Sequence, residues 1–290
     1  MKPPQFEYFD PTTIDEAVSL LREREGEAKV LAGGQSLVPL LNMRLARPEA
    51  LVDLRRIEGL DYIREENGAL AIGAMTTQRT VERSDVVRER LPLLQAATRL
   101  IAHPQIRNRG TVGGSLAHAD PAAEYPALAL ALDAEVLAVG PNGERTIKAS
   151  ELFLGYLATA LEPAEVLTEV RFPKPPADSG WSVMEVARRH GDFALAGVVT
   201  ALSLNGGSIS DARIALFGVA SAPLRAREAE GLLAGEKPGE ALFAEAGRHA
   251  AAGIEEPLSD IHASAEFRRH LAATLVKRAL AEAAERAGAR

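Results

Sequence analysis

Two Gly-Gly segments constrain this chain more than any other feature of its sequence. The first, AGGQS, covers residues 32–36 and directly follows the apolar run of residues 29–31. The second, TVGGS, covers residues 111–115. Glycines let a phosphate approach the backbone, and free N–H groups at a helix start attract anions. The two segments together predict two clamps on one phosphate-bearing ligand, whereas the first segment taken alone is equally compatible with a tight turn.

The residues around the first segment predict a strand, a glycine loop and a helix in that order. Thr13 and Glu16 form a capping-box pattern that predicts a helix start. Residues 29–32 are typical of a short buried strand, and leucines recur at helical spacing after residue 36. Further along, Glu65-Glu66-Asn67-Gly68 predicts a hairpin turn between two strands at residues 60–64 and 69–74.

A polar and basic stretch at residues 105–110 leads into the second Gly-Gly segment. It contains Arg107 and Arg109. Three interpretations of these arginines remain open: they neutralise a phosphate, they position the loop, or they form a solvated surface pair. The segment itself predicts a loop, because His103-Pro104 ends the helical pattern before it.

The C-terminal third has a different pattern. The Pro-rich stretch at residues 173–176 is the best candidate for a domain boundary. Beyond it, three long strands are predicted at residues 181–188, 194–204 and 209–220, followed by helices near 228–233, 239–252 and 264–287. Strands first and helices afterwards predict an α+β domain.

Composition excludes several classes of protein. The formal net charge is −7, so a general nucleic-acid binder is not expected. The chain has no cysteine, which excludes a disulfide and any thiolate-ligated iron–sulfur or zinc site on this chain. No apolar run is long enough to span a membrane, and the N-terminal residues lack a signal-peptide pattern. We expect a cytoplasmic protein that does not span a membrane.

No common catalytic motif is present. His103, His118, Asp120 and Glu124 are the candidates for a metal site, but none of them makes a His-x-x-x-His or comparable pair. The nucleophile elbow, the Rossmann fingerprint and the Walker pattern are all absent. The chain therefore has the character of a ligand platform without acid–base residues of its own.

Four stretches resemble one known family. They are AGGQSLVPLLNMRLARP (32–48), HPQIRNRGTVGGSLAHADPAAE (103–124), ARRHGDFALAGV (187–198) and GVASAPLRAREAE (218–230). They look like the FAD-binding medium subunit of molybdenum hydroxylases, a family that includes carbon monoxide dehydrogenase and xanthine dehydrogenase. The resemblance covers nearly the whole chain, and the Gly-Gly pairs stand in the family's order.

The resemblance implies an α+β fold with three parts. The FAD-binding half would comprise two subdomains of the vanillyl-alcohol-oxidase-like type, at residues 1–58 and 59–176. Residues 177–290 would form an α+β C-terminal domain with an antiparallel three-stranded sheet and helices.

The resemblance also implies roles for individual residues. The two Gly-Gly segments would hold the FAD pyrophosphate from two sides, and Glu124 would lie near the ribose or ribityl hydroxyls. Leu161 matches a leucine of the adenine or flavin pocket. Phe193 stands where relatives often carry a tyrosine beside the isoalloxazine ring, so the stacking face is kept and the hydroxyl is lost. The complete predicted cofactor-binding set is Ala32, Gly33, Gly34, Gln35, Ser36, Leu37, Thr111, Gly113, Gly114, Ser115, His118, Asp120, Glu124, Leu161 and Phe193, with no catalytic residue and no metal ligand.

The function implied is electron transfer through FAD. Because the chain has no cysteine, iron–sulfur clusters would come from a small partner subunit, and molybdopterin from a large one. Two alternatives remain open at this point: a self-sufficient flavin oxidase, and a flavin-free assembly or structural protein with the same fold.

Overall fold

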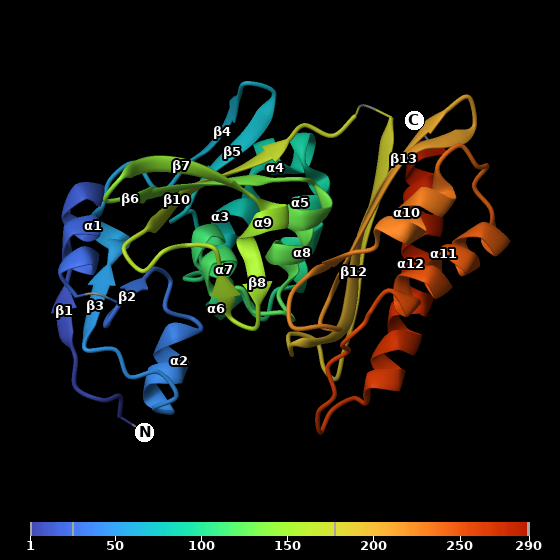
Figure 1. Cartoon of the computed structure of the whole chain (residues 1–290). Helices are drawn as coiled ribbons and strands as arrows, with labels where there is room; N and C mark the ends of the chain where they lie inside the picture. Colours follow the sequence, from blue (N-terminus) through green and yellow to red (C-terminus); the bar gives the residue numbers. More distant parts are fainter. Residues whose placement is uncertain (1, 25, 177, 289–290) are drawn as a thin grey trace.

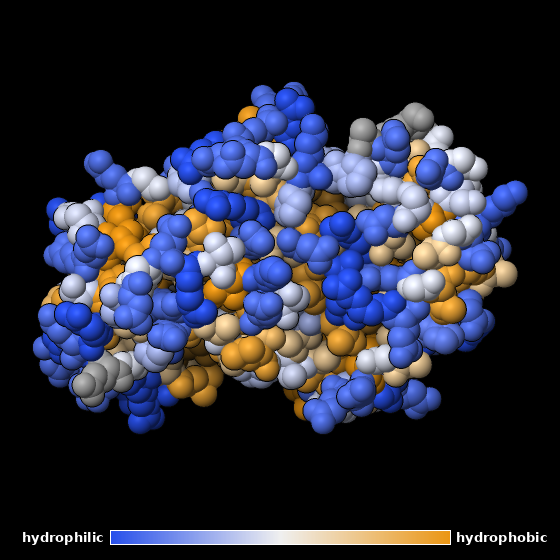
Figure 2. Space-filling model, turned by 45° about the horizontal axis from the view of Figure 1, so that its top comes forward, coloured by the Kyte–Doolittle hydropathy of each residue, from blue (hydrophilic) through white to orange (hydrophobic). Residues whose placement is uncertain are grey.

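The computed structural model describes residues 2–24, 26–176 and 178–288, so the predicted boundary at residue 177 and the last two residues lie outside the described residues. The three larger of the four β-sheets, with their helices, follow one another along the molecule (Figure 1). Figure 2 shows hydrophilic side chains over most of one face, with apolar side chains in separate patches. No helix of the described ranges is both long and apolar enough to cross a membrane.

The N-terminal part is a parallel sheet with strand order β1-β3-β2. A crossover helix connects each strand to the next, and α1 begins as predicted, with the Thr13 hydroxyl accepting from the Glu16 N–H at 3.2 Å. The elements are β1 (Glu7–Phe9), α1 (Ile14–Glu23), β2 (Ala28–Leu31), α2 (Leu37–Asn42), β3 (Ala50–Asp53) and a 3₁₀ turn (Leu54–Arg56).

The central part is an antiparallel five-stranded sheet with order β4-β5-β10-β6-β7, covered by short helices. The predicted hairpin is confirmed, since Asn67 and Gly68 both have positive φ between β4 and β5. Its first strand starts three residues later than predicted, because Leu60 packs into the N-terminal core instead. The strands are β4 (Ile63–Glu66), β5 (Ala69–Gly73), β6 (Glu135–Gly140), β7 (Gly143–Lys148) and β10 (Val166–Pro173), with a small pair β8 (Phe153–Gly155) and β9 (Ala158–Thr159).

The helices of the central part lie between this sheet and the C-terminal sheet (Figure 1). One of them, α6, occupies part of the predicted basic loop, because Pro104 is tolerated at the first position of a helix. They are α3 (Gln78–Arg83), α4 (Asp85–Arg90), α5 (Pro92–Leu100), α6 (Pro104–Arg107), α7 (Val112–His118), α8 (Glu124–Ala131) and α9 (Ala149–Leu152).

The C-terminal part is an antiparallel sheet backed by three helices. The three predicted strands are confirmed, and a two-residue fourth strand extends the sheet in the order β11-β12-β13-β14. One face packs against α10–α12, and the other shares a core with the central helices, which explains the almost unbroken apolar sequence of β12. The elements are β11 (Ser179–Ala187), β12 (Ala194–Asn205), β13 (Ser208–Phe217), β14 (Leu224–Arg225), α10 (Arg227–Leu233), α11 (Glu240–Ala252) and α12 (Ala265–Gly288).

Candidate functional site

The fold brings the two Gly-Gly segments into contact. A Cβ atom placed on Gly33 would lie 2.1 Å from the carbonyl oxygen of Arg109, which directly precedes the second segment. A Cβ atom on Gly114 would lie 3.4 Å from the Cβ of Ala32. Glycine is therefore required at position 33 because backbone packs against backbone there.

A cavity of about 430 Å³ lies beside the first segment. Residues 31–35 form one wall, and Asn42, Asp53, Arg55 and Arg109 contribute polar groups to the others. Asp53 lies next to Leu31 in the register of the parallel strands β3 and β2, so the carboxyl ends of both strands meet at this cavity. Ligands bind at this edge of parallel sheets in many α/β proteins.

The backbone N–H groups of the two segments differ in availability. Within the described residues, the N–H groups of residues 33–36 donate to no protein acceptor, and Ser36 makes no side-chain cap on α2. In the second segment, the N–H groups of Val112 and Gly113 donate to the carbonyl oxygens of Thr76 and Ala74 at 3.0 and 2.9 Å. The first segment therefore offers free donors, whereas the start of α7 is already bonded within the protein.

Thr111 completes the internal bonding of the second segment. Its hydroxyl accepts a hydrogen bond from the Gly114 N–H at 3.0 Å, which caps α7. Thr111 itself is buried and forms an isolated antiparallel bridge with Thr77. The N–H groups of residues 112–115 therefore all have hydrogen-bond partners within the protein.

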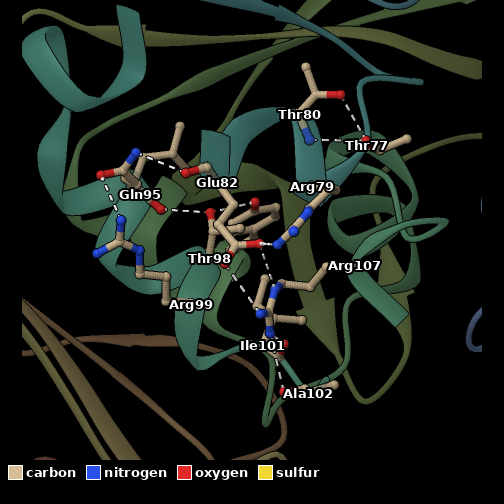
Figure 3. A network of polar contacts seen from close by, with 12 residues as sticks. Thr77, Arg79, Thr80, Glu82, Gln95, Thr98, Arg99, Ile101, Ala102 and Arg107 are labelled. Atoms are coloured by element: carbon tan, nitrogen blue, oxygen red, sulfur yellow. Dashed lines mark hydrogen bonds and ion pairs between the residues drawn. The ribbon is translucent and has the colours of Figure 1, made fainter. Parts of the chain in front are cut away.

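The two arginines of the basic stretch have different roles. Arg107 is buried, so it is neither a phosphate ligand nor a solvated surface residue, and the third interpretation, that it positions the loop, is confirmed. Its guanidinium pairs with Glu82 at 3.1 Å and donates to the carbonyl oxygen of Ile101 at 2.7 Å (Figure 3). Arg109 is exposed at the cavity and forms no ion pair within the described residues. Of these two arginines, Arg109 is the one available to an anionic ligand.

Acidic groups gather where α8 meets the C-terminal sheet. Burial, the charge of Glu185 and the charge of Asp120 raise the pKa of Glu124 from 4.5 to about 8, against the lowering effect of a backbone hydrogen bond. Burial raises the pKa of Glu185 to about 7. Nearby, burial lowers the pKa of His118, and the charge of Asp120 opposes this change. Glu185 was not predicted from the sequence.

The raised pKa of Glu124 implies that the stability of the folded chain depends on pH. The folded chain keeps Glu124 protonated to higher pH than the unfolded chain does, so stability is lost as the pH rises from about 5 to about 8. A pKa that differs by one between the folded and unfolded chain corresponds to about 1.4 kcal/mol. We expect Glu124→Gln to reduce this loss by at least about 1 kcal/mol, measured by urea denaturation of the FAD-free chain at both ends of the range. An identical pH slope in the variant would contradict this assignment.

Of the predicted set, only residues 32–35 line the cavity beside the first segment, and all other members lie outside its lining. Phe193 is exposed in the loop between β11 and β12, and Leu161 packs at the edge of the central core. Sequence reasoning missed Asn42, Asp53 and Arg55. The run ALVDL at residues 50–54 predicts a second strand, which places Asp53 near a strand end but assigns it no role.

Two family models together match nearly the whole chain. Residues 4–175 match the family described as the FAD binding domain in molybdopterin dehydrogenase, and residues 181–283 match the CO dehydrogenase flavoprotein C-terminal domain. The chain belongs to this family of FAD-binding flavoprotein subunits. The resemblance inferred from the four sequence stretches is thereby confirmed.

Individual relatives are similar over their full length. The carbon monoxide dehydrogenase medium chain of Hydrogenophaga pseudoflava is 43% identical over 97% of each chain. The 6-hydroxypseudooxynicotine dehydrogenase complex subunit alpha of Paenarthrobacter nicotinovorans is 43% identical over 99% of this chain and 97% of its own. A solved structure of carbon monoxide dehydrogenase from Hydrogenophaga pseudoflava, lacking the Mo-pyranopterin moiety, superimposes with a TM-score of 0.96 over 99% of both chains, at 44% identity. The predicted fold class is confirmed.

Proposed function

We propose that this chain binds FAD at the packed Gly-Gly segments and passes electrons from the iron–sulfur clusters of a partner subunit to an external acceptor. The observation that carries the proposal is the first Gly-Gly segment: it lines a cavity, it packs against the second segment, and the N–H groups of residues 33–36 donate to no acceptor in the described part of the chain. Free backbone donors beside a cavity suit a diphosphate.

The residues present fit FAD. The first segment and Arg109 would bind the diphosphate, and Ser115 adds a hydroxyl at the second segment. His118 ends α7, and Asp120 and Glu124 come after it; these three residues would face the sugar or ribityl part. Phe193 and Leu161 would lie beside the rings. FAD supplies the redox chemistry when bound, and the chain supplies binding and orientation.

The partners are proposed from the family and from composition. The chain has no cysteine, so it cannot ligate an iron–sulfur cluster through thiolates. Its relatives are named as a medium chain and as one subunit of a complex. We therefore place it beside a small iron–sulfur subunit and a large molybdopterin subunit. The names of these relatives refer to different substrates, which fits a substrate chosen by another subunit.

The three-part division and the location of the protein are also proposals. Separate sheets support subdomains at residues 1–58 and 59–176 and a C-terminal domain from residue 177. The helices α10–α12 and their sheet have a core of their own. We place the assembled complex in the cytoplasm.

Arg109 is expected to strengthen FAD binding through its charge. A hydrogen bond between a guanidinium and a phosphate contributes about 1.5–3 kcal/mol, so Arg109→Gln should weaken FAD affinity roughly tenfold or more. The measurement is a fluorescence titration of the FAD-free chain. Arg83→Gln, an exposed arginine on α3, serves as the control and should leave the affinity unchanged. Equal affinities for the two variants would remove Arg109 from the site.

Electron transfer is tested with the partner subunit. The FAD-loaded chain is mixed anaerobically with the reduced iron–sulfur subunit, and loss of the visible bands of oxidised flavin is followed. Rapid bleaching only when the partner is present supports the proposed function. Flavin reduction by a small substrate without a partner would identify a self-sufficient oxidase. A complex that assembles without flavin would identify a structural protein.

A further inference from the structure

Glu185 lies on the face of the C-terminal sheet that meets the FAD-binding domain. Side chains alternate between the two faces of a strand. Trp181 and Val183 pack against the core shared with the central helices, whereas Met184 and Val186 pack against the core formed with α10–α12. Glu185 therefore shares the first face, two residues before the end of β11 and shortly before the loop that carries Phe193.

The carboxylate of Glu185 lacks a partner inside the described part of the chain. Its Oε2 atom is buried and makes no hydrogen bond. The side chain acts electrostatically on Glu124, the first residue of α8, and no basic group is among those that act on either carboxyl. Burying a carboxyl group without a hydrogen-bond partner costs free energy. A ligand that donates hydrogen bonds to Glu185 would remove this cost.

A carboxyl group accepts hydrogen bonds in either protonation state, through two oxygens when ionised and through its carbonyl oxygen when protonated. Neutral hydroxyl groups are suitable partners for such acceptors, and FAD carries hydroxyls on both its ribityl chain and its ribose. The described residues contain no group of three or more His, Cys, Asp or Glu able to hold a metal ion. A polyol is thus the ligand chemistry that the two carboxyl groups fit.

We infer that Glu185 is a cofactor-binding residue contributed by the C-terminal domain, which together with Glu124 accepts hydrogen bonds from hydroxyl groups of FAD. This inference rests on the proposed function. Glu124 belongs to the family domain at residues 4–175 and Glu185 to the one at residues 181–283. The cofactor would therefore bridge the two domains, and its binding would hold them together.

The test uses Glu185→Gln in the full chain, because glutamine preserves the size of the side chain. We expect the variant to weaken FAD affinity roughly tenfold, since one oxygen that accepts hydrogen bonds is replaced by an NH₂ group that only donates them. We also expect the FAD-free variant to melt at the same or a higher temperature than the wild type, since a buried unpaired carboxyl is removed. A residue with a merely structural role would lower the melting temperature and the affinity together, and that result would overturn the inference.

The control is Glu228→Gln, an exposed position at the start of α10 that should change neither quantity. Titrations with FMN and with ADP then separate the two sources of hydroxyls. Weakened binding of FMN alone identifies the ribityl chain, and weakened binding of ADP alone identifies the ribose. FAD affinity unchanged by Glu185→Gln overturns the inference while leaving the proposed function intact. A wild-type chain that binds no FAD overturns both.

Discussion

Gly33→Ala is expected to abolish FAD loading. The new Cβ atom would lie 2.1 Å from the carbonyl oxygen of Arg109 and 2.9 Å from the Cα of Gly110. Both are backbone atoms, so no side-chain rotation relieves the overlap, and the first segment must move away from the second. Overpacking of this kind costs about 1–3 kcal/mol of stability. Displacing the free N–H groups of residues 33–36 should weaken FAD binding at least about 100-fold, equivalent to about 2.7 kcal/mol.

The effect is measured as the FAD-to-protein ratio after desalting, together with the melting temperature. Gly231→Ala is the matched control, because a Cβ at Gly231 in α10 meets no atom within 4 Å. Alanine there should leave loading unchanged and stabilise the helix by up to about 1 kcal/mol. Full FAD loading by Gly33→Ala would show that the packed Gly-Gly segments do not form the binding site.

Arg107→Leu is expected to destabilise the chain by about 3 kcal/mol, because it leaves Glu82 buried with less compensation. Glu82 would keep only Arg79, which donates to it at 2.7 Å. The same guanidinium of Arg107 donates to the carbonyl oxygens of Ile101 and Ala102, and Ala102 is held at a φ of 40° (Figure 3). Without these bonds the turn before the second Gly-Gly segment should relax, and FAD affinity should fall as well.

Urea denaturation gives the change in the free energy of unfolding. Arg107→Lys keeps the charge but not the forked geometry and should recover part of the loss. Arg88→Leu removes an exposed pair with Asp85 and should cost less than about 1 kcal/mol. If Arg107→Leu and Arg88→Leu had equal effects, the buried network would have no special role in stability.

Local patterns predicted the elements of the fold well. The capping box at Thr13, the hairpin at Asn67-Gly68 and the C-terminal strands each depend on residues close together in sequence, and each is present. The missed elements are short or ambiguous. Pro104 starts α6 although a proline also fits a helix end, and β14 has only two residues.

The candidate site was predictable only in part. The Gly-Gly segments have a sequence signal because backbone contact requires glycine. The role of Arg107 depends on Glu82, which is 25 residues away on another helix, and the role of Glu185 depends on burial between two domains. Such long-range pairs leave no local pattern. The sequence also could not show that the N–H groups of the two segments differ in availability. The acceptors of the Val112 and Gly113 N–H groups lie far away in the sequence and are brought close only by folding.

The central claim is tested most directly by the visible absorption spectrum of the purified full chain, recorded after incubation with FAD and desalting. We expect flavin bands that stay with the wild-type protein at about one FAD per chain and are lost in Gly33→Ala. A correctly folded wild-type chain that remains colourless, alone and after assembly with its partner subunits, would contradict the central claim.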